Sequence, residues 1–202
     1  KEGENSICAL VWFWGDEKNY SYNSSGQGGF IFEAVSEDIT IISDKSWKVK
    51  KNNAYSDNLL NQPNYRLPEH SIYFDARKDF SDWENGNYDF SSWESATEYA
   101  VGGEGTYGKL CPRGIPFLKD YGLKDYENST DYENYTVKKL FGEKITVDIP
   151  YNAQLTPYLK IIAPAGKKIR ITTENTLIGA VSNTYITKEG EQEFEALGWF
   201  NG

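Results

Sequence analysis

The stretch Tyr73-Phe74-Asp75-Ala76-Arg77 carries the strongest prediction of fold in this chain. Its aromatic residues favour a short strand over Ile72–Asp75, and strand side chains alternate between two faces. Asp75 and Arg77 then share one face, where each can pair with a neighbour across a sheet. Because the planar guanidinium of arginine matches a carboxylate, we expect Asp75 and Arg77 to act as a buried structural clamp. Ligand binding by Arg77 is the alternative.

Two tryptophans follow this stretch, Trp83 in Asp82-Trp83-Glu84 and Trp93 in Ser92-Trp93-Glu94. Six Trp and fifteen Tyr contribute to an aromatic share of 15%, although the mean hydropathy is −0.65. Many rings must therefore lie half-exposed, where they pack against a core or stack on the face of a sugar. Core packing is the commoner role, so we assign Trp83 and Trp93 a structural function.

Short segments rich in β-branched or aromatic residues, bounded by Gly, Pro, Asn or Asp, recur along the chain. This spacing predicts an all-β sandwich or jelly roll. The tight-turn sequence Pro164-Ala165-Gly166-Lys167 predicts that Leu155–Thr173 forms a hairpin. The expected strands are Ile7–Trp14, Phe30–Val35, Ile39–Ser43, Ile72–Asp75, Leu155–Ala163, Lys168–Thr173, Thr184–Thr187 and Gln192–Leu197.

The segment Lys119–Tyr135 differs from its surroundings because acidic residues and tyrosines are interleaved in it without strand alternation. We interpret it as a linker and place a domain boundary near residue 125. The expected organisation is a jelly roll over residues 1–125, followed by the start of a second antiparallel β-sandwich over residues 126–202.

The net charge of −9 argues against nucleic acid as a partner, because phosphate binding needs clustered Lys and Arg. No apolar run reaches the length of a membrane-spanning helix, so we expect no membrane insertion. Cys8 lies in an apolar run and is expected to be a buried free thiol, with a Cys8–Cys111 bridge as the alternative.

Few residue patterns in the chain suggest catalysis. His70 is the only histidine, and no Gly-x-Ser-x-Gly sequence accompanies it. Glu193 and Glu195 are spaced so that both lie on one strand face, as a pair of glycosidase carboxylates could, but a solvated strand face explains them better. A self-contained glycosidase is therefore the least favoured class of function.

Several motifs, in order along the chain, resemble the N-terminal region of bacterial α-L-rhamnosidases of glycoside hydrolase family 78. Together they span nearly the whole sequence, and each is weak alone. The matching segments are Lys1–Ile7, Ile42–Lys48, Tyr73–Arg77 with Trp83 and Trp93, Leu110–Pro116, and Tyr185–Gly202 with its Gly-x-Gln-x-Phe-Glu pattern.

The resemblance implies a partial galactose-binding-like jelly roll followed by a partial β-sandwich, upstream of an (α/α)6 barrel that hydrolyses terminal α-L-rhamnose with inversion. The catalytic carboxylates of that family lie in the barrel, and no matching segment occurs in this chain. The region is therefore expected to be a non-catalytic accessory part of a glycoside hydrolase. Its implied partners are the downstream barrel and a rhamnose-containing glycan, and its implied location is secreted or periplasmic.

Some relatives use this jelly roll as a calcium-dependent rhamnose-binding module, and Asp57-Asn58 stand in a similar place to their ligands. Carboxylate and amide oxygens suit Ca²⁺, so Asp57 and Asn58 are the candidate metal and sugar ligands. Leu59–Pro68 intervenes before Glu69, whereas the family reaches its Glu within a few residues. Two alternatives stay open, namely a free-standing calcium-dependent lectin-like module and a turn that Asp57 merely caps.

Overall fold

The computed structural model describes residues 3, 5–13, 28–57, 72–100, 104, 108–117, 119–139, 142–151, 153–172, 182–196 and 200–201. Over these ranges the protein is all-β, with short strands arranged in several sheets and two 3₁₀ helices, η1 (Ala76–Lys78) and η3 (Ser129–Tyr132). The prediction of an all-β protein is confirmed. No helix within the described ranges is long and apolar enough to cross a bilayer.

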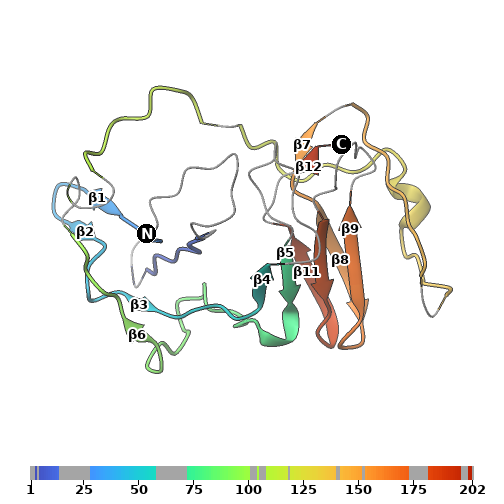
Figure 1. Ribbon diagram of the computed structural model, residues 1–202, viewed down its shortest axis with the longest axis horizontal. Coiled ribbons are helices and arrows are strands. Elements are labelled where there is room, and N and C mark those ends of the chain that lie inside the picture. Colours follow the sequence, from blue (N-terminus) through green and yellow to red (C-terminus); the bar gives the residue numbers. More distant parts are fainter. Residues whose placement is uncertain are drawn as a thin grey trace.

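The largest sheet has four strands and contains Tyr73-Phe74-Asp75 (Figure 1). Its strands, in spatial order, are β4 (Tyr55–Asp57), β5 (Ile72–Asp75), β10 (Ser182–Ile186) and β9 (Lys168–Thr172). β5 and β10 run parallel, whereas the two outer pairs are antiparallel. β5 precedes residue 125 and β10 follows it, so strands from both sides of the predicted boundary share one sheet. The boundary itself stays a prediction.

Two further antiparallel pairs form two-stranded sheets of their own, and the longer pair forms the other layer. Here β8 (Tyr158–Ala163) pairs with β11 (Gly190–Glu195), and β7 (Gln154–Leu155) pairs with β12 (Phe200–Asn201). Only one face of β11 is buried, since Gln192 and Phe194 are buried while the intervening glutamates are exposed. That burial pattern directs the apolar side of β11 toward the four-stranded sheet.

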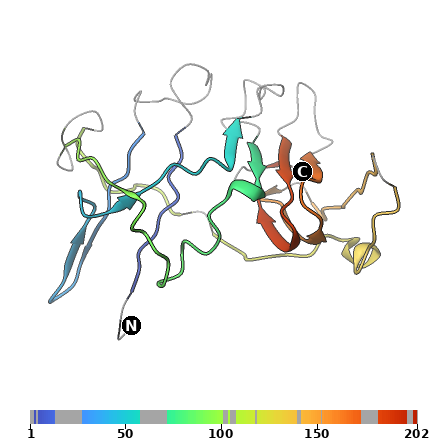
Figure 2. The ribbon, with the colours of Figure 1, turned by 90° about the horizontal axis from the view of Figure 1, so that it is seen from below.

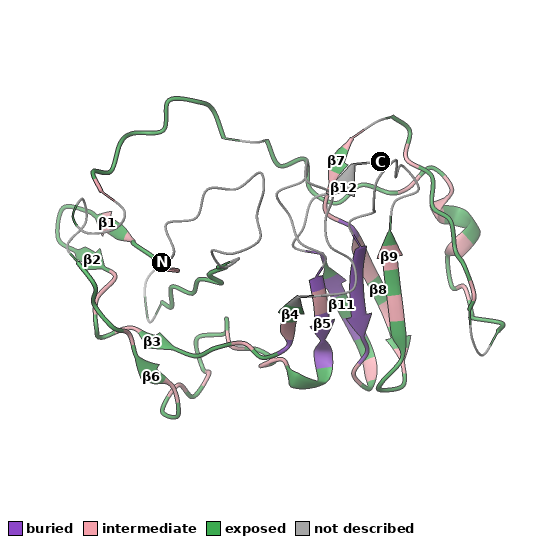
Figure 3. Ribbon diagram, viewed as in Figure 1, coloured by how far each residue is buried: buried purple, intermediate pink, exposed green. Residues whose placement is uncertain are grey.

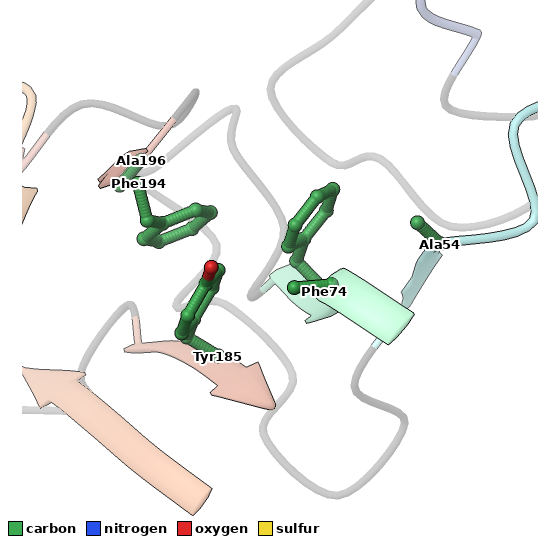
Figure 4. Packing of buried hydrophobic residues seen from close by; sticks show 6 residues of the cluster. Ala54, Phe74, Tyr185, Phe194 and Ala196 are labelled. Atoms are coloured by element: carbon green, nitrogen blue, oxygen red, sulfur yellow. The ribbon is translucent and has the colours of Figure 1, made fainter. Parts of the chain in front are cut away.

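Aromatic side chains join the two layers (Figure 4), and most of β5 is buried (Figure 3). The ring of Tyr185 in β10 lies 5.6 Å from that of Phe74 and 4.5 Å from that of Phe194, between ring centroids. Ala54 and Ala196 complete the buried cluster, and β10 is buried along its whole length. Since each large ring brings a large apolar area out of water, these contacts stabilise the packing of the two layers.

The predicted hairpin over Leu155–Thr173 is wrong, because β8 and β9 belong to different sheets. The turn at 164–167 instead crosses between the layers, with Gly166 at φ +81°. A second crossing turn, between β10 and β11, lies against it. The Gly166 N–H donates to the Thr187 carbonyl at 2.8 Å, and the Thr187 N–H donates to the Lys167 carbonyl at 2.9 Å. A tight-turn sequence specifies a reversal of direction, but not which strand becomes the neighbour.

The N-terminal part of the chain forms smaller pairs, β1 (Glu33–Val35) with β2 (Thr40–Ile42) and β3 (Lys48–Val49) with β6 (Glu94–Ser95). Figures 1 and 2 both place β1 and β2 at the end of the molecule far from the sandwich. Trp47 is half-buried there, with its ring 5.6 Å from that of Phe30 and 5.8 Å from that of Phe32.

The strand predicted over Ile7–Trp14 is wrong for residues 7–13, which are exposed and form no strand; Trp14 lies outside the described residues. An apolar run alone does not supply a partner strand, and residues 7–13 form no backbone hydrogen-bond ladder with another strand. Cys8 and Cys111 are free, and both are exposed, so the expected burial of Cys8 is also wrong. The remaining predicted strands are present, although Phe30–Val35 shortens to β1 and Leu155–Ala163 breaks at Thr156-Pro157.

Candidate functional site

The Asp75–Arg77 pair lies where β5 ends and η1 begins. Asp75 caps η1, because its carboxylate accepts the Arg77 backbone N–H at 3.2 Å. The same carboxylate accepts the guanidinium Nε and Nη2 of Arg77 at 2.8 Å each. The two residues therefore pair with each other in a bidentate contact, and not with neighbours across the sheet. The reason is local: the strand stops at Asp75, so Arg77 is no longer in strand alternation.

Burial and charge make this contact asymmetric. The Asp75 side chain is 4% exposed and the Arg77 side chain 49%. The hydrogen bonds from Arg77 hold the pKa of the Asp75 carboxyl below its usual 3.8, against the opposing effect of burial. Lys78 adds a weaker contact, with Nζ 3.8 Å from Asp75 Oδ2. The carboxylate is thus ionised and fully engaged by the chain's own donors.

Arg77 also reaches the crossing turn between β8 and β9. A Cβ placed on Gly166 would lie 3.5 Å from Arg77 Nη1, so the guanidinium lies beside this turn. The pair therefore links the end of β5 to the point where the chain passes between the two layers. This geometry is that of a structural contact which leaves part of the guanidinium in solvent.

The two tryptophans lie in a satellite aromatic cluster. Trp93 is at its centre, with the rings of Phe80, Trp83, Tyr88 and Phe90 at 5.5, 6.3, 5.9 and 5.1 Å between centroids. Both tryptophans are half-buried, and Trp93 Nε1 is buried without a hydrogen-bond partner among the described residues. Trp93 thus has ring neighbours on several sides, which is a packing arrangement.

The predicted calcium and sugar ligands are only partly placed. Asp57 is the last residue of the edge strand β4, where its backbone pairs with Ile72. Asn58 lies outside the described residues, as does His70. No group of three or more His, Cys, Asp or Glu side chains within the described ranges could hold a metal ion.

A buried polar network that the sequence analysis missed fills the turn between β10 and β11. Gln192 Nε2 donates to the carbonyls of Lys188 and Gly190 at 2.8 and 2.9 Å, and Gln192 Oε1 accepts from the Lys188 N–H at 2.9 Å. The Tyr185 hydroxyl contacts the same oxygen at 3.1 Å. One signal could have revealed it: in Glu191-Gln192-Glu193-Phe194-Glu195 the glutamine alternates in phase with the buried phenylalanine.

The paired glutamates of β11 lie on its exposed face, as expected of a solvated strand. Lys160 Nζ of β8 contacts Glu191 at 2.9 Å and Glu193 at 3.0 Å, and Thr156 Oγ1 donates to Glu195 at 2.9 Å. The hydrogen bonds from Lys160 lower the pKa of Glu193. A general acid needs a raised pKa, so this carboxylate is poorly suited to that role.

Comparison with family models, with curated proteins and with solved structures found no match to this chain.

Proposed function

We propose that this chain is a non-catalytic, carbohydrate-associated region of an inverting α-L-rhamnosidase, which releases terminal α-L-rhamnose from glycans or glycosides. Residues 1–125 would form part of a galactose-binding-like jelly roll and residues 126–202 the start of a second β-sandwich. The catalytic carboxylates would lie in a helical barrel of the same protein. The all-β architecture supports this proposal without specifying either fold.

One observation carries the proposal. Two of the motif segments behind the resemblance, Tyr73–Arg77 and Tyr185–Gly202, are far apart in the sequence, yet they contribute to the same core. The ring centroids of Phe74 and Phe194 lie 5.5 Å apart, and Tyr185 contacts both rings. Contact between the two segments in one buried cluster supports interpreting the two matches together.

The local chemistry of the motif residues agrees with an accessory role. Asp75 is occupied by Arg77, and Gln192 is occupied by the turn that it fills. Each therefore has a structural partner in place of a substrate. An accessory region of this kind stabilises and orients a catalytic domain or holds it near its glycan.

The test is an assay of rhamnose release from an aryl α-L-rhamnoside. Residues 1–202 are compared with the product of the reading frame extended past the codon for Gly202. We expect the extension to encode a helical barrel with paired acids, and activity to require it. Cleavage by residues 1–202 alone would contradict the accessory role, and an extension that encodes no such barrel would contradict the assignment to a rhamnosidase.

The position of Asp57 favours one alternative, a calcium-dependent lectin-like module. Asp57 is the last residue of the edge strand β4, and Asn58 follows it in the sequence. Calorimetric titration with methyl α-L-rhamnoside should then show binding that requires Ca²⁺ and is lost in Asp57→Ala and Asn58→Ala. Asp38→Ala is the control, because Asp38 is an exposed aspartate between β1 and β2. Equal binding in all variants would exclude Asp57 and Asn58 as the ligands.

A further inference from the structure

The ladder between β8 and β11 determines which backbone groups of these strands point outward. The Ala196 N–H donates to the Pro157 carbonyl at 2.8 Å, one step beyond the pair Glu195–Tyr158 that ends the ladder. In an antiparallel ladder, hydrogen-bonded pairs alternate with pairs whose N–H and C=O groups point away from each other. The outward groups therefore belong to Tyr158, Lys160 and Ile162 of β8 and to Glu191, Glu193 and Glu195 of β11.

Both outer edges of this two-stranded sheet are open. β8 and β11 pair only with each other, and within the described ranges no backbone hydrogen bond joins the outward groups of either strand to another residue. An open edge can pair with a further strand, and natural proteins protect such edges with charged side chains or proline. The two edges differ in this protection.

The edge of β11 is protected by like charges. Its three outward residues are all glutamates, and all three are exposed. A second copy that paired antiparallel along this edge would place glutamates directly opposite glutamates, which is unfavourable. The edge of β11 is therefore unsuited to pairing with itself.

The edge of β8 lacks this protection. Ile162 is 83% exposed and Tyr158 is half-buried, and neither side chain is charged. The one cation among the three outward residues is Lys160, whose Nζ lies 2.9 Å from Glu191 and 3.0 Å from Glu193. Because carboxylates of the same chain compensate this cation, the edge of β8 presents open backbone groups without a repelling charge.

The edge of β8 is also complementary to itself. A new antiparallel pair forms hydrogen bonds only between outward residues, so the register that uses all three places Lys160 opposite Lys160 of the second copy and Tyr158 opposite Ile162. An aromatic ring opposite a β-branched side chain is a favourable cross-strand pair, and two-fold symmetry supplies it twice. Pro164, at the next outward position, has no N–H to donate, so the new pairing ends with β8.

We propose that two copies of this chain associate through β8, which pairs antiparallel with β8 of the second copy about a two-fold axis at Lys160. The product is a four-stranded sheet in the order β11, β8, β8, β11. This association closes on itself, because each copy contributes the same edge. One strand pair makes a small interface, so we expect a weak, concentration-dependent dimer. The inference rests on the β8–β11 sheet alone and is independent of the proposed function.

Light scattering of residues 1–202 over a series of concentrations tests the proposal. The mass should rise from 23.0 kDa toward twice that value as the concentration increases. Ile162→Lys places a charge opposite Tyr158 of the second copy and should raise the dissociation constant about tenfold. Ile115→Lys is the matched control, because Ile115 is 68% exposed and lies in none of the described strands. Thermal unfolding verifies that both variants are folded.

Disulfide trapping with oxidised glutathione tests the register in a background of Cys8→Ser and Cys111→Ser. Lys160→Cys should form a covalent dimer, because hydrogen-bonded residues opposite each other have Cα atoms about 5.5 Å apart, within the range of a disulfide. Ile162→Cys should not, because the two copies of this position lie four residues apart along the strands, about 13 Å.

Three results would each overturn the proposal. The first is a mass that stays at 23.0 kDa at every concentration. The second is equal association of Ile162→Lys and Ile115→Lys, which would assign any dimer to another surface. The third is a failure of Lys160→Cys to trap more covalent dimer than Ile162→Cys, which would exclude the two-fold register at Lys160.

Discussion

The rings of Phe74 and Phe194 stack with centroids 5.5 Å apart and an interplanar angle of 28°, which ties β5 of one sheet to β11 of the other. Tyr185 lies against both rings, so three aromatic side chains from three strands form the centre of the sandwich. Residues from Tyr73–Arg77 and from the C-terminal segment that begins at Tyr185 therefore meet in one core.

Phe194→Ala should therefore be among the most destabilising substitutions in the sandwich. Removing a buried ring leaves a cavity and loses its apolar burial, so we expect the free energy of unfolding to fall by about 3–5 kcal/mol. Urea unfolding monitored by tryptophan fluorescence measures this. Ile162→Ala in β8 is the control, because Ile162 is 83% exposed and its truncation should leave stability nearly unchanged. Equal effects of the two variants would be inconsistent with this core.

Gln192→Ala should destabilise the protein although it removes no ring. It would leave the carbonyls of Lys188 and Gly190 and the Lys188 N–H without their partner, at a cost of about 2–3 kcal/mol. Chemical denaturation compared with that of Glu193→Gln, on the exposed face of the same strand, provides the measurement. If Gln192→Ala were as stable as Glu193→Gln, the hydrogen bonds of Gln192 would not contribute to the stability of the turn between β10 and β11.

Arg77→Ala should lower the free energy of unfolding, since it removes two charge-assisted hydrogen bonds from the buried Asp75 carboxylate. Lys78→Ala removes only the weaker contact at 3.8 Å from an exposed lysine and should cost less than about 1 kcal/mol. Thermal and urea unfolding of the two variants distinguish the roles of the neighbouring cations. A larger loss of stability in Lys78→Ala than in Arg77→Ala would contradict the assignment of Arg77 as the main partner of Asp75.

Lowering the pH should reduce the free energy of unfolding, in part because Asp75 becomes protonated. Its pKa in the folded protein lies below the ordinary 3.8, so the unfolded chain takes up the proton first as the pH falls. The contribution of Asp75 is complete well above the unfolded-chain pKa of 3.8, and it is lost progressively as the pH falls through 3.8 toward the lower pKa of the folded protein. In Arg77→Ala the folded pKa moves back toward 3.8, so urea unfolding at a series of pH values should give a shallower loss. An unchanged acid dependence in this variant would show that Arg77 does not set the pKa.

Strand positions could be predicted from local sequence because β-branched and aromatic residues alternate between turn residues. The segments that become β2, β5, β9 and β11 illustrate this. Strand partners could not be predicted, since Pro164–Lys167 specifies a turn whether its two strands share a sheet or separate into two layers. The pairing of β5 with β10 likewise depends on the buried contact between Phe74 and Tyr185, which local sequence does not encode.

For the candidate site, as for the strands, the sequence indicated which residues matter but not which partners they contact. The composition and spacing of Asp75 and Arg77 indicated a clamp, but the end of β5 decided that its two members pair with each other. Trp83 and Trp93 were expected to be structural, and their rings are 6.3 Å apart in one cluster. Gln192 was missed because a glutamine between two glutamates suggests an exposed strand face. Its spacing of two residues from the buried Phe194 places both side chains on the buried face of β11. For Asp57 and Asn58 the sugar-binding role stays a prediction.

Rhamnose release from an aryl α-L-rhamnoside tests most directly the proposal that this chain is the accessory part of a rhamnosidase. The protein encoded by the reading frame extended past Gly202 should release rhamnose with inversion of configuration, and residues 1–202 should release none. Release by residues 1–202 alone, or the absence of release by the extended protein, would contradict the account.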